Sequence, residues 1–210
     1  MENQNNIKKF CQELRGFKPV HDLKITRKLF DCLQISKSQT REEAYVLFLE
    51  WMQKAYMQMA YGVTNRNILI LVGPQGTYKT SFLNNLCPLQ LKEYSYCTHI
   101  PLSPHYEYTI SLLTETAFVN IDDQLSVIIG RDMRTMMDIR SRSIFVTRKT
   151  YREASTEVQR IANIMASCNS LPDSLLNEKE LSIIHINSIS REYASINMYS
   201  VWIEIANSIN

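Results

Sequence analysis

Glycine and proline are scarce in this sequence, with five and six residues respectively among 210. Hydrophobic residues make up 45% of the chain, so the composition excludes a fibrous or disordered protein and indicates a packed globular one. No apolar run approaches the roughly 18 residues that a membrane-spanning helix needs. Residues 1–10 also lack the apolar segment of a secretory signal, so we expect neither a membrane span nor secretion.

Cysteine and histidine form no pattern typical of a disulfide framework or a zinc site. The cysteines are odd in number and none belongs to a C-x-x-C pair; they are Cys11, Cys32, Cys87, Cys97 and Cys168. The four histidines are isolated. Scattered single cysteines are typical of reduced thiols, which predicts a cytoplasmic protein and argues against metal binding through Cys or His.

Positive charge is concentrated in one segment of a chain whose net charge is only +2. Residues 131–152 carry seven Lys or Arg against two Asp, a local charge of +5, whereas the rest of the chain carries −3. Such a segment is a candidate surface for anions, including nucleic acid. A solvated helix face followed by a basic loop would have the same composition.

The N-terminal part of the chain has a helical pattern. Residues 5–16 are a short amphipathic stretch, and residues 40–62 are a longer one. In the longer stretch, Thr40 and Glu43 match a capping box and Gly62 ends the run. Its methionine-rich apolar stripe is interpreted as core packing, with a groove for a partner as the alternative.

From residue 67 onward, apolar strands alternate with helices. The expected strands are 67–73, 116–123, 143–148, 160–169 and 181–189, and the expected helices are 79–86 and 194–209. Continuous apolar runs are typical of parallel strands buried on both faces. The predicted fold is therefore α/β, with a mainly parallel sheet and helices on both faces. We divide the chain into a helical N-terminal region, residues 1–62, and an α/β core, residues 63–210.

Residues 73–80 match the phosphate-binding loop pattern G-x-x-x-x-G-K-[ST], which connects a buried strand to a helix. In such a loop the backbone N–H groups and the helix N-terminus face the phosphates. Lys79 would contact the terminal phosphates, and the Thr80 hydroxyl would bind Mg²⁺. The residues expected to contact ATP are Gly73, Pro74, Gln75, Gly76, Thr77, Tyr78, Lys79, Thr80 and Ser81.

Tyr78 stands where this pattern has its last glycine. A side chain there is compatible with phosphate binding if the backbone is right-handed and the ring points away from the nucleotide. A closed, degraded site is the alternative.

Two aspartates follow the second apolar strand. Asp122 and Asp123 lie about 40 residues after Lys79, and in nucleotide hydrolases acidic residues at such a strand end hold Mg²⁺ and orient the attacking water. Asp122 is therefore the candidate metal ligand and Asp123 a candidate catalytic residue. A pair of aspartates in an ordinary turn is the alternative interpretation.

With both motifs in place, residues 65–91 resemble the P-loop ATPase domain of the virulence-associated protein E family, which phages and mobile elements encode. The form G-x-Q-G-x-x-K-[ST] is characteristic of that family, whose members commonly carry an aromatic residue in place of the last glycine. The family is related to superfamily-3 helicases. The resemblance therefore implies an AAA+-like sheet, ATP, Mg²⁺ and a homo-oligomeric ring such as a hexamer.

The resemblance runs from about residue 42 to residue 210, is weaker after residue 125, and includes residues 146–169. It implies that Asn169 is a polar sensor of the γ-phosphate and that residues 149–159 form a hairpin toward a central channel. The residues that it implies in contact with DNA, single-stranded rather than duplex, are Arg148, Lys149, Tyr151 and Arg152. For Tyr151, packing into the sheet is the alternative to stacking on a base.

One departure from the family concerns arginine. Relatives carry an arginine pair after the sensor strand, but here no arginine lies between Arg160 and Arg191. Because a trans-acting arginine strongly accelerates hydrolysis, three possibilities follow: Arg160 or Arg148 acts as the arginine finger, hydrolysis is slow, or nucleotide is bound without turnover. Aspartate rather than glutamate at position 123 also favours slow hydrolysis or binding without turnover, because a shorter carboxylate positions the attacking water less well.

The leading hypothesis is an ATP-hydrolysing, helicase-like motor that acts on DNA in replication of a phage or mobile element, together with a primase or another replication partner. The first alternative is a nucleotide-gated nucleic-acid-binding or assembly protein with a degenerate P-loop site. The second is a small P-loop kinase, which the lack of an arginine-rich lid disfavours.

Overall fold

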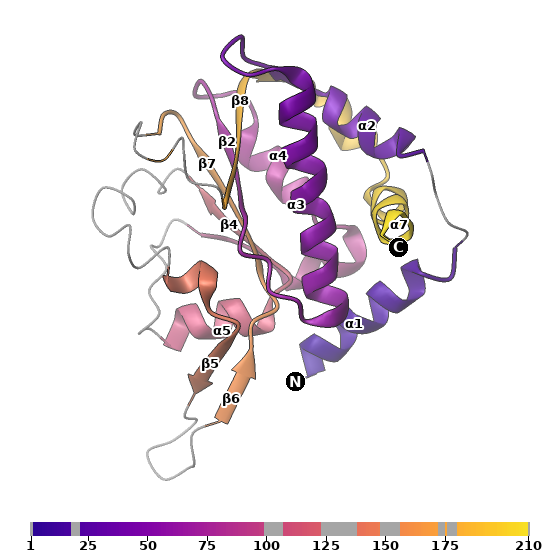
Figure 1. The fold of residues 1–210 in the computed structure, drawn as a ribbon, viewed down its shortest axis with the longest axis vertical. Helices are drawn as coiled ribbons and strands as arrows, with labels where there is room; N and C mark the ends of the chain where they lie inside the picture. Colours follow the sequence, from indigo (N-terminus) through magenta and orange to yellow (C-terminus); the bar gives the residue numbers. More distant parts are fainter. Residues whose placement is uncertain are drawn as a thin grey trace.

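The computed structural model describes residues 2–17, 22–98, 107–122, 138–147, 156–171, 175 and 180–209. Its centre is a six-stranded sheet with the order β1-β8-β2-β7-β4-β3 (Figure 1). The strands are β1 (Leu33–Ile35), β2 (Ile68–Val72), β3 (Ser95–Thr98), β4 (Phe118–Asp122), β7 (Asn163–Cys168) and β8 (Leu181–Ile189). All neighbours pair in parallel except β1 and β8, which are antiparallel. The predicted α/β fold with a mainly parallel sheet is confirmed.

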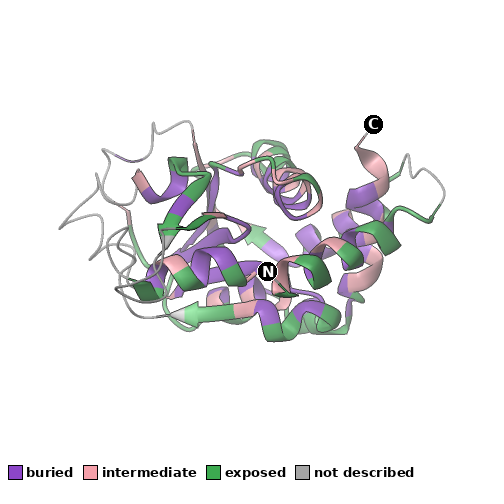
Figure 2. Ribbon diagram, turned by 90° about the horizontal axis from the view of Figure 1, so that it is seen from below, coloured by how far each residue is buried: buried purple, intermediate pink, exposed green. Residues whose placement is uncertain are grey.

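Helices cover both faces of this sheet. They are α1 (Glu2–Leu14), α2 (Lys24–Asp31), α3 (Arg41–Tyr61), α4 (Lys79–Asn85), α5 (Glu107–Glu115) and α7 (Met198–Ser208), with the 3₁₀ helices η1 (Leu89–Tyr94) and η3 (Arg191–Ser195). In Figure 1, α1, α2, α3 and α7 lie on one side of the sheet and α5 on the other. The helices turn buried residues toward the sheet and exposed residues outward (Figure 2).

Strand β2 is apolar throughout because both of its faces are covered. Leu69 and Leu71 belong to the core shared with α3, α4 and α7, while Ile68, Ile70 and Val72 belong to the second core, shared with α5. All five residues are buried. Successive side chains of β2 thus pack alternately into two different cores. This explains why the sequence of β2 is a continuous apolar run rather than an apolar–polar alternation.

Helix α3 begins and ends where its sequence predicts. The Glu43 N–H donates to Thr40 Oγ1 at 3.2 Å, and the Thr40 N–H donates to the Glu43 carboxylate at 3.1 Å, which completes the capping box. Gly62 ends the helix in the left-handed conformation, with φ of 72°. Met52 and Met59 are buried in the core, so the interpretation of the methionine stripe as core packing is confirmed.

The N-terminal region shares its core with the rest of the chain. Strand β1 extends the sheet by pairing with β8, and side chains of α1, α2 and α3 belong to the same apolar cluster as those of β2, β8 and α7. Residues 1–62 and 63–210 are therefore not packed as separate units. Neither α2 nor β1 was expected from the sequence.

Two further strands stand apart from the main sheet. Strands β5 (Ile144–Thr147) and β6 (Thr156–Gln159) pair antiparallel with each other and project from the body of the protein (Figure 1). The strand expected at residues 143–148 is present, but its expected place in the mainly parallel sheet is wrong. Antiparallel pairing agrees with a hairpin, whose connection, residues 148–155, lies outside the described residues.

Candidate nucleotide-binding site

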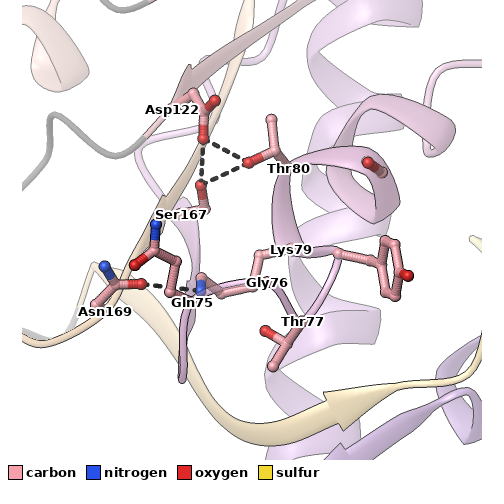
Figure 3. A pocket seen from close by; sticks show the side chains of 10 residues that line it. Gln75, Gly76, Thr77, Lys79, Thr80, Asp122, Ser167 and Asn169 are labelled. Carbon is pink, nitrogen blue, oxygen red and sulfur yellow. Dashed lines mark hydrogen bonds between the residues drawn. The ribbon is translucent and has the colours of Figure 1, made fainter.

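A pocket of about 440 Å³ lies at the carboxyl ends of β2, β4 and β7. Its lining comprises Gln75, Gly76, Thr77, Tyr78, Lys79, Thr80, Ser81, Asp122, Ser167 and Asn169 (Figure 3). Most of these residues come from the loop between β2 and α4, residues 73–78, and from the start of α4. The carboxyl ends of parallel strands are the usual place for a ligand site in such a sheet. The fold therefore brings the two sequence motifs to one pocket.

Lys79 places a buried cation at the base of this pocket. Its side chain is only 7% exposed, and its Nζ donates to the backbone oxygens of Gly73 and Pro74, both at 2.8 Å. The same Nζ donates to Asn169 Oδ1 at 3.2 Å, across from the β2–α4 loop to the end of β7 (Figure 3). Lys79 and Asn169 were both predicted to belong to the site. They are 90 residues apart in the sequence and in direct contact in the structure.

Thr80, Asp122 and Ser167 form a second polar cluster on the same wall (Figure 3). The Thr80 hydroxyl donates to Asp122 Oδ1, and the Ser167 hydroxyl donates to the same oxygen at 3.0 Å. The two hydroxyl oxygens are 3.3 Å apart. The predicted metal-binding residues Thr80 and Asp122 thus lie side by side. Their hydroxyl and carboxylate oxygens are the kind of ligand that Mg²⁺ prefers.

Ser167 was not predicted from the sequence. It pairs directly with Asp122 in the register of β4 and β7, which places their side chains next to each other. Because side chains alternate along a strand, residue 167 also lies on the same face as residue 169. Counting back two positions from the predicted sensor Asn169 would have found it.

Tyr78 has the left-handed backbone conformation that glycine would supply at this position of the loop. Its φ is 65° and its ψ 21°, a left-handed conformation, so the right-handed backbone that was the condition for accommodating a side chain at this position is not the one present. It is the one non-glycine residue with positive φ in the part of the chain that the structure describes. The ring is 40% exposed, and the Arg191 guanidinium lies over it, 4.4 Å from its centroid. The Arg191 Nη2 also donates to the Tyr78 hydroxyl.

Glycine is required at two positions of the β2–α4 loop, for a different structural reason at each. A Cβ on Gly73 would collide with the backbone oxygen of Ile186 in β8, so the close approach of β2 and β8 requires glycine there. Gly76 has φ of 78° and open space around it, so its requirement is conformational. Gly73 and Pro74 contribute backbone oxygens to Lys79, whereas Gly76 lines the pocket itself.

Five predicted functional residues lie outside the described part of the chain. They are Asp123, Arg148, Lys149, Tyr151 and Arg152. The catalytic role of Asp123 and the DNA contacts of the other four therefore stay predictions.

Arg160 lies in the protein interior, which does not fit the arginine finger considered from the sequence. It is 1% exposed, and its guanidinium donates only to backbone oxygens among the contacts described: those of Asn65, Ile139, Arg140 and Ala162, at 2.6 to 3.2 Å. Burial lowers the pKa of Arg160 to about 10. A finger must reach the nucleotide of a neighbouring subunit, whereas Arg160 ties the segment before β5 to the loop before β2.

Comparison with protein families finds one match that spans most of the chain. The virulence-associated protein E-like domain matches residues 14–196. The chain belongs to this family. The family resemblance drawn from the sequence is confirmed. A search of curated proteins finds no match.

Solved structures with the same fold include three of the NrS-1 C-terminal region. The A form apo structure of that region has a TM-score of 0.60 at 17% identity and covers 94% of this chain and 48% of its own. A second apo structure, of residues 305–718, has a TM-score of 0.58 at 14% identity with the same coverage. The A form of residues 305–718 has 0.55 at 14% identity, covering 92% and 46%. This chain spans about half the length of these solved chains.

Among the described residues, none of the helices combines the length and the apolar character that a membrane span requires.

Proposed function

We propose that this family member binds ATP with Mg²⁺ in the pocket at the carboxyl ends of β2, β4 and β7, and hydrolyses it as a helicase-like motor on DNA. The observation that carries the proposal is the convergence on one pocket of Lys79 and Thr80, from the loop–helix junction, and Asp122, from the end of β4. A cation, a hydroxyl and a carboxylate in this order are the three side-chain types that phosphoryl transfer in P-loop proteins requires.

The pocket residues divide into a phosphate side and a metal side. Lys79 would interact with the terminal phosphates, and the N–H groups of residues 75–80 would surround them. Asn169, in contact with Lys79 Nζ, would hold that cation and sense the γ-phosphate. Bound Mg²⁺ would neutralise phosphate charge and polarise the reacting phosphoryl group.

The metal side fits Mg²⁺ by its chemistry. Thr80 and Asp122 would hold the ion, and Ser167 would orient the Asp122 carboxylate by the hydrogen bond at 3.0 Å. In the described ranges, no group of three or more His, Cys, Asp or Glu side chains could hold a metal ion. That agrees with Mg²⁺, which is usually bound by one or two carboxylates together with the phosphates of its nucleotide. Asp123 would orient the attacking water.

The proposal that DNA is the second substrate rests on the family and on the positive charge concentrated in residues 131–152. The antiparallel pair of β5 and β6 supports the proposal, because the segment of sequence between these two strands contains Arg148, Lys149 and Arg152. Lysine and arginine in such a connection would follow a nucleic-acid backbone without reading its bases. We propose a homo-oligomeric ring, such as a hexamer, that acts on single-stranded DNA beside a primase or another partner in replication of a phage or mobile element.

Nucleotide binding without turnover is the second candidate function, and the position of Arg160 favours it. Of the two arginines that were considered as substitutes for the missing pair, Arg160 is 1% exposed and bonded to backbone oxygens. Without an arginine finger, the site would bind ATP and gate assembly or nucleic-acid binding.

Steady-state ATPase activity with Mg²⁺, with and without single-stranded DNA, tests these two functions. Wild type, Lys79→Ala and the control Lys24→Ala are compared, because the Lys24 side chain is 80% exposed and lies outside the pocket. Turnover that rises with DNA and is lost only in Lys79→Ala is expected of the motor. ATP binding that needs Lys79 but gives no turnover would select the gated protein. Absence of ATP binding in wild type would refute both functions.

A further inference from the structure

Tyr78 occupies a conformation that glycine supplies in the usual phosphate loop. With φ of 65° and ψ of 21°, its Cβ is close to the following carbonyl oxygen, a strained arrangement for a residue with a side chain. Strained residues of this kind persist when their surroundings fix them. The neighbours of Tyr78 should therefore include a group that holds it.

Arg191 meets this requirement with two contacts. Its guanidinium carbon lies 4.4 Å from the centroid of the Tyr78 ring, which is a cation–π geometry. Its Nη2 donates to the Tyr78 hydroxyl at the far end of the same side chain. One contact holds the ring face and the other its tip, so the whole side chain is fixed.

The position of Arg191 is itself set by packing against α4. Arg191 begins η3, whose Tyr193 ring packs edge-on against the Phe82 ring of α4, with centroids 5.4 Å apart. Asn85 Nδ2, also of α4, donates to the Tyr193 backbone oxygen at 3.4 Å. Because η3 follows β8, which borders β2 on the side away from β7, Arg191 approaches the loop from the side opposite Asn169.

We propose that Arg191 is a positioning residue for ATP binding. By stacking on Tyr78, it holds that residue in the left-handed conformation, so the tyrosine–arginine pair replaces the last glycine of the loop. This inference rests on the proposed ATP site. Arg191 is not among the described residues that line the pocket, so it acts through Tyr78 and not on the phosphates.

The consequence is that Arg191 matters only while residue 78 has a side chain to hold. Glycine reaches the left-handed conformation without support. We therefore expect Arg191→Ala to weaken ATP affinity about tenfold in the wild-type background, which is the loss typical of one charge-assisted hydrogen bond with a cation–π contact. Tyr78→Gly removes the side chain that Arg191 holds, so Arg191→Ala should have no further effect on ATP affinity in that background.

Calorimetric titration with ATP and Mg²⁺ measures these four affinities. Arg15→Ala is the matched control, because Arg15 stacks on the Tyr61 ring at 4.8 Å in the same kind of pair but neither residue lines the pocket. The control should bind ATP as wild type does. Equal losses on Arg191→Ala in both backgrounds, or no loss in the wild-type background, would overturn the inference.

Amide hydrogen exchange provides a readout that needs no nucleotide. In Arg191→Ala, exchange in the peptide covering residues 73–82 should be several-fold faster than in wild type, while Arg191→Ala in the Tyr78→Gly background should leave it unchanged. Unchanged exchange in Arg191→Ala would contradict the inference even if wild type bound no ATP. The proposed function and this inference can therefore fail separately.

Discussion

Ser167 shows how much of the site depends on a single hydroxyl group. Its hydrogen bond to Asp122 Oδ1, at 3.0 Å, orients the carboxylate beside Thr80. Ser167→Ala removes a charge-assisted hydrogen bond, which typically contributes about 1.5–3 kcal/mol, so we expect roughly tenfold weaker ATP binding with Mg²⁺. Affinity measured in EDTA should change little, because the phosphate side is intact. The control is Ser170→Ala, an exposed serine; equal affinities of the two variants with Mg²⁺ would contradict the role of Ser167.

Two buried thiols make stability depend on alkaline pH. Burial raises the pKa of Cys11 and of Cys87 from 9.0 to about 12. Between these values the unfolded chain loses thiol protons that the native protein keeps, so the free energy of unfolding falls as pH rises above 9. The two thiols together should remove about 3 kcal/mol between pH 8 and pH 10.

Urea unfolding at pH 8 and pH 10 tests this dependence. The variant Cys11→Ala/Cys87→Ala is compared with wild type, because tyrosines and lysines titrate in both proteins and cancel in the difference. Wild type should lose more stability than the variant over this interval. The same pH dependence in both proteins would show that these thiols do not carry the effect.

At the scale of single elements, α2 depends on a carboxylate from the other end of the chain. Its N-cap position, Leu23, makes no side-chain hydrogen bond. Instead the buried Glu204 carboxylate of α7 accepts from the N–H groups of Ile25 and Thr26, at 2.9 and 2.7 Å, and from the Thr26 hydroxyl at 2.8 Å. A negative charge at a helix N-terminus also interacts favourably with the helix dipole.

Glu204→Ala should therefore reduce the free energy of unfolding by about 2 kcal/mol, since it leaves buried N–H groups without an acceptor. Glu204→Gln retains one acceptor oxygen and should lose about half as much. Urea unfolding measures both, with the exposed Glu13→Ala as the control. A loss in Glu204→Ala no larger than in Glu13→Ala would exclude this capping role.

The elements that the sequence predicted are those that local patterns define. The capping box of α3, the doubly buried strand β2 and the closing helix α7 all depend on residues close in sequence. Strand β1 forms only because β8, about 150 residues away, offers an edge, and α2 is capped by Glu204. No window of local sequence contains such partners, so these elements were missed.

The same distinction holds for the site. Spacing within one loop and at one strand end identified Lys79, Thr80 and Asp122, which the structure brings together. Ser167 and Arg191 depend on strand register and on the packing of η3 against α4, which the sequence does not reveal directly. The left-handed backbone of Tyr78 could not be predicted from the sequence, because its support comes from Arg191, 113 residues away.

At the scale of the whole molecule, the uneven charge suggests how the protein would bind nucleic acid. Each lysine or arginine that neutralises a phosphate of single-stranded DNA contributes about 0.7 to the slope of log affinity against log salt concentration. Lys149→Ala/Arg152→Ala, at the connection of β5 and β6, should therefore reduce that slope by about 1.4 and weaken binding equally for all sequences. Fluorescence anisotropy with a labelled single strand at several salt concentrations measures both quantities.

The control Lys24→Ala/Lys37→Ala removes the same charge from exposed positions on the N-terminal region and should leave the slope unchanged. Equal changes in the two double variants would mean that net charge, and not the hairpin, determines DNA binding.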